Sequence, residues 1–336
     1  MKGATGKFAP FVERDRTSRI SEFARGFFNF LQSKGVPSAI LHGGGDGFEN
    51  PLSDVDFAVA GNVWGNLTRL IHEYCGGAGW RLCQVLRHEP TAAYHVCSAI
   101  DDPACAVALD ACSDYQRNGT VYLTASELLE ERKPYLWGGF SLTPEKELCY
   151  RFAKAAAKSK EVAGVAEEFA RYPEPARKNC ETWLAKHWGI ILAGWDPEDL
   201  KTGLGDLRRR SNRRPPVFNA DSFARIVSRI LSPSGMIVVT GGGDFDEISR
   251  ELEATFGHLY FRRFLKVDRW KPALIKGLVA STVIVVPEMP GIVESLLPAD
   301  CVYRPDGGQD TGELLLNFAR CLAERCARRE MLSNPG

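Results

Sequence analysis

The sequence lacks the features of a secreted or membrane-anchored protein. It has ten cysteines, but no CxxC pair and no cysteine and histidine residues at the spacing of a zinc site. No apolar run approaches the roughly 20 residues that cross a bilayer, and the opening stretch "MKGATGKFAPFVERDR" lacks the apolar segment of a signal peptide. We therefore expect a cytoplasmic protein without a membrane span, whose cysteines are mostly buried thiols.

An excess of basic charge is also missing. The 42 lysines and arginines balance 42 aspartates and glutamates, so the formal net charge is zero. A general nucleic-acid binder normally carries a basic excess that neutralises phosphates, so this balance argues against nucleic acid as a partner. The length of 336 residues favours two domains, and the sequence shows no internal repeat or low-complexity tract.

Apolar patterning divides the chain into three parts with an overall α/β character. Helical spacing from Thr17 to Lys34 precedes strand-like runs that continue, with one more helical stretch, to about residue 130. From Pro144 to about Leu207 only helical patterns occur, and the arginine-rich segment "RRRSNRRPP" at 208–216 is typical of a solvated linker. A second α/β pattern follows. The predicted boundaries are 1–140, 141–216 and 217–336.

Three aspartates in apolar surroundings are candidate metal ligands. Asp54 and Asp56 are two positions apart in a strand-like run, so both carboxylates leave the same face and repel each other. A hard divalent cation such as Mg²⁺ or Mn²⁺ relieves that repulsion. Asp110 interrupts the apolar run "CAVALDAC", where an unpaired carboxylate is costly. Two alternatives stay open: Asp54 suits a turn or cap equally well, and Asp114 competes with Asp110 as the third carboxylate.

Glycines and lysines near these aspartates are candidate phosphate ligands. Gly43 and Gly44 precede the aspartate pair by about ten residues, and glycine there lets backbone N–H groups approach a phosphate closely. Lys154 and Lys158 share one face of a predicted helix that could receive phosphates, although a solvated helix face explains them equally well.

The stretch "LHGGGDGFENPLSDVDFAVA" resembles the hG-G/S, spacer, Dh-D/E-h signature of the nucleotidyltransferase superfamily that includes DNA polymerase β. With Asp110 as third acidic residue, the resemblance covers about residues 17–125. It implies a mixed sheet and metal-dependent transfer of a nucleoside monophosphate from a nucleoside triphosphate. Gly44 stands where many active members have a serine that helps to hold the triphosphate.

The resemblance also implies roles for the candidate residues. Asp54, Asp56 and Asp110 become the catalytic metal ligands, with Asp110 as third ligand or base, and Gly43 and Gly44 face the triphosphate. The implied partners are a nucleoside triphosphate and a small-molecule acceptor with a hydroxyl group.

Two later stretches, "SDYQRNGTVYLTASELL" and "LWGGFSLTPEKELCYRFAKAAAK", resemble a group of bacterial proteins associated with polysaccharide clusters. In that group a nucleotidyltransferase-like half is followed by a helical spacer, an arginine-rich linker and a thymidylate-kinase-like P-loop domain. The order here is similar, which suggests a sugar or polysaccharide precursor as acceptor.

The P-loop of that second domain is degenerate in this chain. A P-loop needs GxxxxGK followed by serine or threonine, and the corresponding stretch is "TGGGDFDEIS". Gly241 matches the first glycine, but Asp246, Glu247 and Ile248 replace the second glycine, the lysine and the hydroxyl residue. Acidic groups repel a phosphate, so we expect no kinase activity. A chance resemblance of an unrelated α/β domain remains an alternative.

Two hypotheses of different classes follow from these residues. The first is a magnesium-dependent nucleotidyltransferase whose C-terminal domain supports the fold, forms a homodimer or holds a partner enzyme. The second is a non-catalytic pseudoenzyme that acts as a binding or assembly module in polysaccharide biosynthesis. The three carboxylates favour the first hypothesis, and the degenerate P-loop and Gly44 favour the second.

Overall fold

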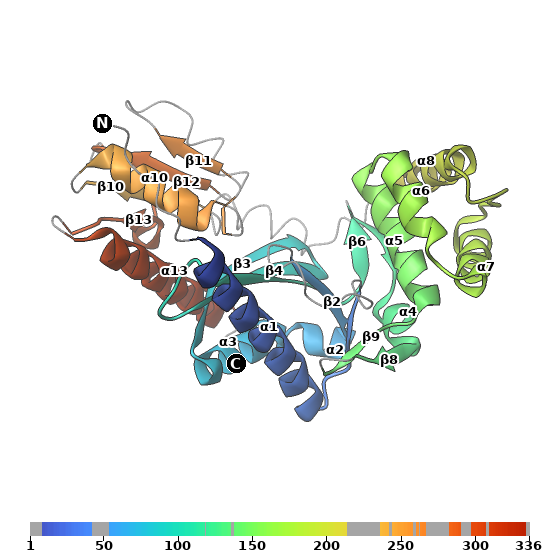
Figure 1. Cartoon of the computed structure of the whole chain (residues 1–336), viewed down its shortest axis with the longest axis horizontal. Coiled ribbons are helices and arrows are strands. Elements are labelled where there is room, and N and C mark those ends of the chain that lie inside the picture. Colours follow the sequence, from blue (N-terminus) through green and yellow to red (C-terminus); the bar gives the residue numbers. More distant parts are fainter. Residues whose placement is uncertain are drawn as a thin grey trace.

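The computed structural model describes residues 9–41, 54–117, 119–135, 138–213, 236–241, 244–257, 260–261, 263–266, 282–289, 297–306 and 309–333. It confirms the α/β class. A mixed seven-stranded sheet occupies the middle of the molecule, a helical unit lies at one end, and a four-stranded parallel sheet lies at the other end (Figure 1).

The seven-stranded sheet has the order β3-β4-β5-β2-β1-β9-β8. Its strands are β1 Ser38–Ile40, β2 Val55–Val59, β3 Trp80–Glu89, β4 Ala92–Ala99, β5 Ala106–Cys112, β8 Arg132–Pro134 and β9 Phe140–Leu142. Strand β2 runs parallel to β5 and antiparallel to β1, which makes the sheet mixed. The sequence patterns did not predict β3, because Arg81, Gln84 and Arg87 interrupt its apolar residues. A separate hairpin joins β6 Tyr115–Arg117 to β7 Thr120–Leu123.

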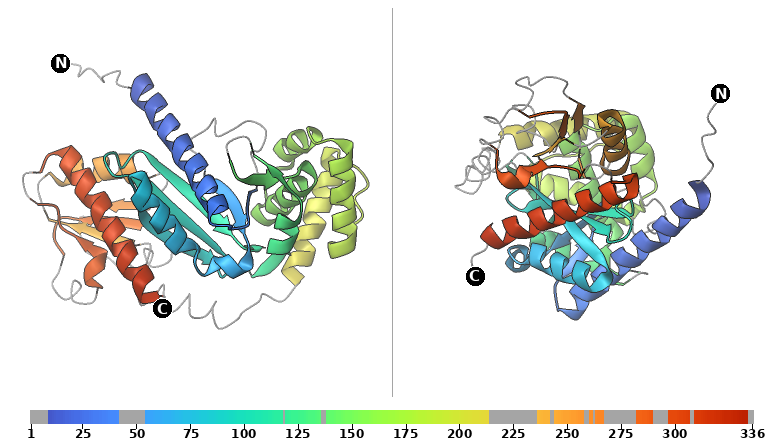
Figure 2. Two further views of the ribbon diagram at one scale, coloured as in Figure 1. Left: turned by 90° about the horizontal axis from the view of Figure 1, so that it is seen from below. Right: turned by 90° about the vertical axis from the view of Figure 1, so that its left-hand side faces the viewer.

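One face of this sheet packs against two helices, α1 Ala9–Ser33 and α3 Leu67–Ala78. The left view in Figure 2 shows α1 running across the face of the sheet. Apolar residues of α1 recur at helical spacing, and Phe27 and Phe28 meet Phe57 of β2 edge to face at ring-centroid distances of 5.7 and 5.4 Å. The short helix α2 Gly61–Trp64 leads into α3, which ends at Gly79 with φ +72°. This layer of helices holds β2 and β5 firmly from one side.

The predicted helical middle is present. It contains α5 Pro144–Lys158, α6 Val162–Ala170, α7 Glu174–Trp183 with a π-helical turn Leu184–Trp188, and α8 Pro197–Arg213. The short helix α4 Ala125–Glu130 precedes it. Trp183 and Trp188 are buried in its core. Residues 189–196 are not helical, although the sequence showed only helical patterns from Pro144 to about Leu207.

The prediction of a solvated linker is wrong for residues 208–213, because α8 continues to Arg213. Two of its arginines stabilise the ends of neighbouring helices instead. Arg208 Nε donates to the carbonyl of Ala156 at 3.1 Å, and Arg210 Nη1 donates to the carbonyl of Trp188 at 2.8 Å. Helix C-termini carry carbonyls without helical partners, and guanidinium groups satisfy them.

The second sheet is parallel, with the order β11-β12-β10-β13. Its strands are β10 Met236–Thr240, β11 Arg263–Lys266, β12 Thr282–Val286 and β13 Val302–Tyr303. Helix α10 Phe245–Phe256 follows β10, a short 3-10 turn Ala299–Cys301 precedes β13, and α13 Thr311–Ser333 closes the described chain. The second α/β pattern that the sequence predicted is therefore present in the described residues.

The two sheets share a hydrophobic core. The second sheet, α10 and α13 form the C-terminal unit. Its buried residues, including Phe256 and Phe318, form one cluster with Cys83, Val96 and Ala106 of the first sheet. The hydroxyl of Tyr260 donates to the carbonyl of Pro103 at 2.8 Å across this contact. The C-terminal unit therefore covers part of the first sheet.

All ten cysteines lie in the described part of the chain, nine of them are buried, and none forms a disulfide. Across the same residues, no helix combines the length and apolar character needed to span a membrane.

Candidate active site

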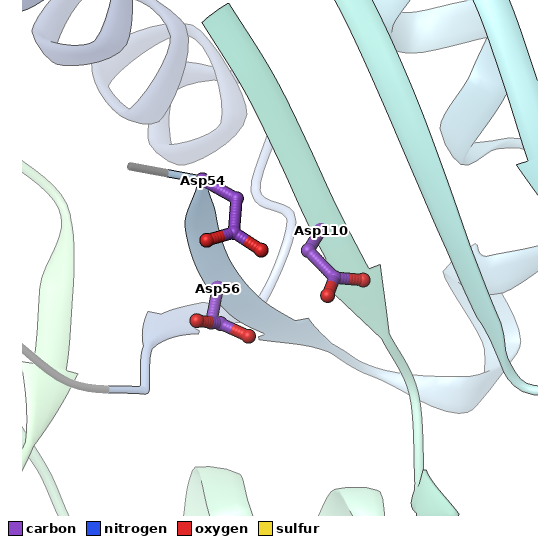
Figure 3. A group of neighbouring side chains, drawn as sticks. All are labelled: Asp54, Asp56 and Asp110. Carbon is purple, nitrogen blue, oxygen red and sulfur yellow. The ribbon is translucent and has the colours of Figure 1, made fainter. Parts of the chain in front are cut away.

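The acidic site is formed by two neighbouring parallel strands. Asp56 on β2 pairs with Asp110 on β5, and Val55 pairs with Leu109. Because side chains alternate along a strand, Val55, Phe57 and Leu109 turn into the core under α1 and α3, whereas Asp56 and Asp110 turn to the opposite face. Asp54 precedes β2 by one residue and joins them. Figure 3 shows the three side chains grouped where β2 and β5 lie side by side.

The three carboxylates are close enough to act together. One oxygen of each of Asp54, Asp56 and Asp110 lies within 4.8 Å of the other two. Carboxylate oxygens are the ligands that Mg²⁺ and Mn²⁺ prefer, and a cation between them offsets their mutual repulsion. The residues present therefore fit a divalent metal, as the spacing predicted.

The environment of Asp110 disfavours its charge. Burial, followed by the neighbouring charges of Asp56 and Asp54, raises the pKa of Asp110 to about 7, while Lys154 and Lys158 oppose the shift. A carboxyl group with this pKa is half-protonated near neutral pH when no cation is bound. A bound divalent cation would favour the ionised form and so oppose the shift.

Helix α5 supplies the counter-charge. Lys154 Nζ lies 2.8 Å from Asp56 Oδ2, and the hydroxyl of Tyr150 donates to Asp56 Oδ1 at 3.2 Å. The ammonium also lies 5.4 Å from the centroid of the Tyr150 ring. Lys158 is one turn further along, and burial together with the charge of Lys154 lowers its pKa. The predicted candidate Lys154 is thus next to the acidic site, whereas Lys160 is exposed.

Two residues of the site were missed in the sequence. His88 on β3 places Nε2 at 3.7 Å from Asp110 Oδ1, and Tyr150 bonds Asp56 directly. Tyr150 is four residues before Lys154, so helical spacing alone could have placed both on one face. His88 lies on the strand that the patterns did not predict, and its place beside Asp110 depends on the strand order.

The competition between Asp110 and Asp114 is settled by geometry. The carboxylate of Asp114 accepts a hydrogen bond from the backbone N–H of Ala125 at 2.7 Å, at the start of α4. Asp114 therefore stabilises a helix N-terminus, where carboxylates are favoured, and Asp110 is the third member of the acidic site.

The acidic site lies on the sheet face between the two other units. Along β5, Ala106, Asp110 and Cys112 share this face. Ala106 belongs to the core shared with the C-terminal unit, and Cys112 belongs to the core of the helical unit. The carboxylates therefore occupy the stretch of sheet that separates these two packed areas. The predicted phosphate-facing residues Gly43 and Gly44 lie outside the described residues.

The stretch that resembles a degenerate P-loop lies at the end of β10 and the start of α10. Gly241 follows β10 with φ +80°, a conformation that glycine adopts readily. Asp244 is the N-cap of α10, and its carboxylate accepts hydrogen bonds from the N–H groups of Asp246 at 3.0 Å and Glu247 at 3.2 Å. These backbone groups are ones that a phosphate would use at a helix N-terminus. Lys266 forms an ion pair with Asp246.

Comparison of the chain with family models, with curated proteins and with solved structures finds no match.

Proposed function

We propose that the chain is a nucleotidyltransferase that uses Mg²⁺ or Mn²⁺ to move a nucleoside monophosphate from a nucleoside triphosphate to an acceptor hydroxyl. The observation that carries this proposal is the convergence of Asp54, Asp56 and Asp110 within 4.8 Å on adjacent strands. Three carboxylates facing one another cost free energy in an apolar setting unless a cation binds them.

The residues of the site have distinct roles in this reaction. Asp54 and Asp56 would hold the metal, whose positive charge would offset the negative charge of the phosphates and of the leaving pyrophosphate. Asp110 is a further ligand or the base that accepts the proton of the acceptor hydroxyl. Lys154 is in position to contact the triphosphate, and Gly43 and Gly44 precede the site in the sequence.

The proposed acceptor is a small molecule with a hydroxyl group, such as a sugar or polysaccharide precursor. The similarity to the polysaccharide-cluster proteins supports this class, and the zero net charge argues against nucleic acid. Ten cysteines without a disulfide are consistent with the reducing environment of the cytoplasm.

For the C-terminal unit we propose a structural role without kinase activity. The support is the Asp244 carboxylate, which already engages the N–H groups of Asp246 and Glu247. A second anion there would meet like charge. The shared core with β3, β4 and β5 adds support, because it makes this unit part of the packing that holds the acidic site.

The test is calorimetric titration of the full chain with each of the four ribonucleoside triphosphates, with and without Mg²⁺. Wild type is expected to bind one of them in a metal-dependent way, and Asp54→Asn/Asp56→Asn is expected to lose that binding. Asp114→Asn is the matched control, since it makes the same chemical change at a capping carboxylate. Absence of any nucleotide binding by wild type would favour the assembly-module hypothesis.

A further inference from the structure

The ion pair between Lys154 and Asp56 engages one of the three carboxylates that are proposed to bind the metal. The side chains of Lys154 and Asp56 are 13% and 7% exposed, so the pair is largely shielded from water. Its N–O distance of 2.8 Å is that of a charge-assisted hydrogen bond. The other oxygen of Asp56 accepts from Tyr150. Both carboxylate oxygens of Asp56 therefore accept hydrogen bonds from side chains of α5.

This arrangement offsets the like charge of the acidic site. Asp54, Asp56 and Asp110 face one another, and burial weakens the screening of their repulsion. The Lys154 ammonium is in contact with one of the three carboxylates. It supplies part of the positive charge that a divalent cation supplies when bound.

The ammonium and a divalent cation compete for Asp56. If both contacted Asp56 Oδ2, two positive charges would be a few ångströms apart in a shielded site, where repulsion is strong. Lysine has a flexible four-carbon stem, so its ammonium can move while the helix stays in place. Once off Asp56, the ammonium remains on the side of the sheet where the phosphates of the substrate are expected.

We propose that Lys154 is an internal counter-ion of the metal-free site, that its ammonium leaves Asp56 when a divalent cation binds, and that it then contacts the triphosphate. The proposal rests on the proposed function and adds a metal-dependent switch to it. It predicts effects of opposite sign. Removal of the ammonium tightens the binding of the bare metal, because a competitor is lost, and weakens the binding of the metal–nucleotide complex, because a phosphate ligand is lost.

The first experiment is a titration of the full chain with Mn²⁺ alone, followed by titration with the nucleotide in the presence of Mg²⁺. In Lys154→Met the Mn²⁺ affinity is expected to rise by about tenfold and the nucleotide affinity to fall by about tenfold. Lys154→Arg keeps the competing charge and is expected to stay near wild type in Mn²⁺ affinity. Lys160→Met, an exposed lysine of the same segment, is the matched control for net charge and is expected to change neither.

The outcomes separate the switch from the proposed function. Equal or weaker Mn²⁺ binding by Lys154→Met overturns the switch, even where metal-dependent nucleotide binding supports the transferase. An unchanged nucleotide affinity in Lys154→Met would overturn the proposal that the ammonium moves from Asp56 to contact the triphosphate. Failure of wild type to bind Mn²⁺ at all overturns the metal site itself, and with it both proposals.

A second measurement uses wild type and does not depend on the folding of a variant. Acetic anhydride modifies exposed amines, and mass spectrometry gives the modification rate of each lysine. The rate at Lys154 is expected to rise several-fold on addition of Mg²⁺ and to fall again when the nucleotide is added, while Lys160 stays constant. A rate at Lys154 that does not respond to Mg²⁺ would overturn the switch.

Discussion

The acidic residues of the first sheet and those of the β10–α10 turn have similar composition but opposite surroundings. In the first sheet, three carboxylates face one another, and lysines approach from a separate helix. At the turn, the carboxylate of Asp244 is bonded to the N–H groups of its own helix. A carboxylate that caps a helix is satisfied within the chain, whereas a cluster of like charges favours a bound cation. Composition alone does not distinguish a binding site from a cap.

The C-terminal unit also packs against the first sheet, which carries the acidic site. The helix α13 packs against the second sheet and also against residues of the first sheet, so its apolar residues serve both. If the role of the C-terminal unit is to stabilise the first sheet, a substitution that destabilises its core should also destabilise the acidic site.

The largest effect is expected from Phe318→Ala. Phe318 is fully buried in the cluster that joins the two sheets. The loss of a buried phenylalanine ring costs about 3–5 kcal/mol, and we expect one cooperative unfolding transition at a lower temperature for the whole sheet. Differential scanning calorimetry measures the transition temperature, and near-UV circular dichroism follows the loss of packing around the aromatic residues of the first sheet. Leu316→Ala, at a partly exposed position of the same helix, is the control. Two separate unfolding transitions, with a lower temperature only for the transition of the C-terminal unit, would show that the two units unfold independently.

The second largest effect is expected from Asp56→Asn, and it concerns the rate of the reaction instead of the packing. Asp56→Asn removes the charge of the central carboxylate, which contacts both Tyr150 and Lys154. We expect metal-dependent nucleotide transfer to fall by at least about 100-fold, as is typical when a group that stabilises the transition state is lost. The full chain is assayed with labelled nucleoside triphosphate and a panel of sugar acceptors. Asp114→Asn should keep wild-type rates, and an equal loss in both variants would point to general damage instead of a metal site.

The acidic site could largely be predicted from the sequence because it depends on local periodicity. Asp54 and Asp56 share a face through the two-residue repeat of a strand, and an aspartate within an apolar run indicated Asp110. Lys154 and Tyr150 lie one helical turn apart, which is again a local relation. What the sequence could not specify is which strands are neighbours, and so the direct pairing of Asp56 with Asp110 is new.

The remaining features depend on contacts between distant segments. His88 was missed because the polar residues Arg81, Gln84 and Arg87 hide the strand that carries it. The arginines of α8 were assigned to a linker because their partners, the carbonyls of Ala156 and Trp188, are far away in sequence. The core shared by the two sheets joins residues more than 150 positions apart, and no pattern within one segment reports such a contact.

The pH dependence sharpens the contrast between the two acidic regions. Burial and like charge raise the pKa of Asp110 from 3.8 to about 7 in the metal-free protein. The folded state therefore binds more protons than the unfolded state between about pH 4 and 7. The contribution of Asp110 to the free energy of unfolding is present at low pH and is lost as pH rises through 7. Because metal and proton compete, Mn²⁺ affinity should be about tenfold lower at pH 6 than at pH 8.

Two titration series check this pH dependence. Calorimetric titrations from pH 5.5 to 8.5 give the Mn²⁺ affinity, and urea unfolding of the metal-free chain gives the stability. Asp110→Asn should remove the loss of stability with rising pH, and Asp114→Asn should keep it. An Mn²⁺ affinity that is constant across this range would mean that Asp110 is already ionised without metal.

The smallest effect is expected at the turn. Asp244→Ala removes the N-cap of α10 and should lower the free energy of unfolding by about 1 kcal/mol, since the N–H groups of Asp246 and Glu247 lose their acceptor. Urea unfolding measures this change, and calorimetry with Mg²⁺ and nucleotide measures the acidic site, which should be unaffected. Asp306→Ala, an exposed carboxylate elsewhere in the same unit, controls for the loss of charge. If Asp244→Ala abolished nucleotide binding while the protein stayed folded, the turn would be a ligand site after all, and the distinction between a capped helix and a cation-binding cluster would fail.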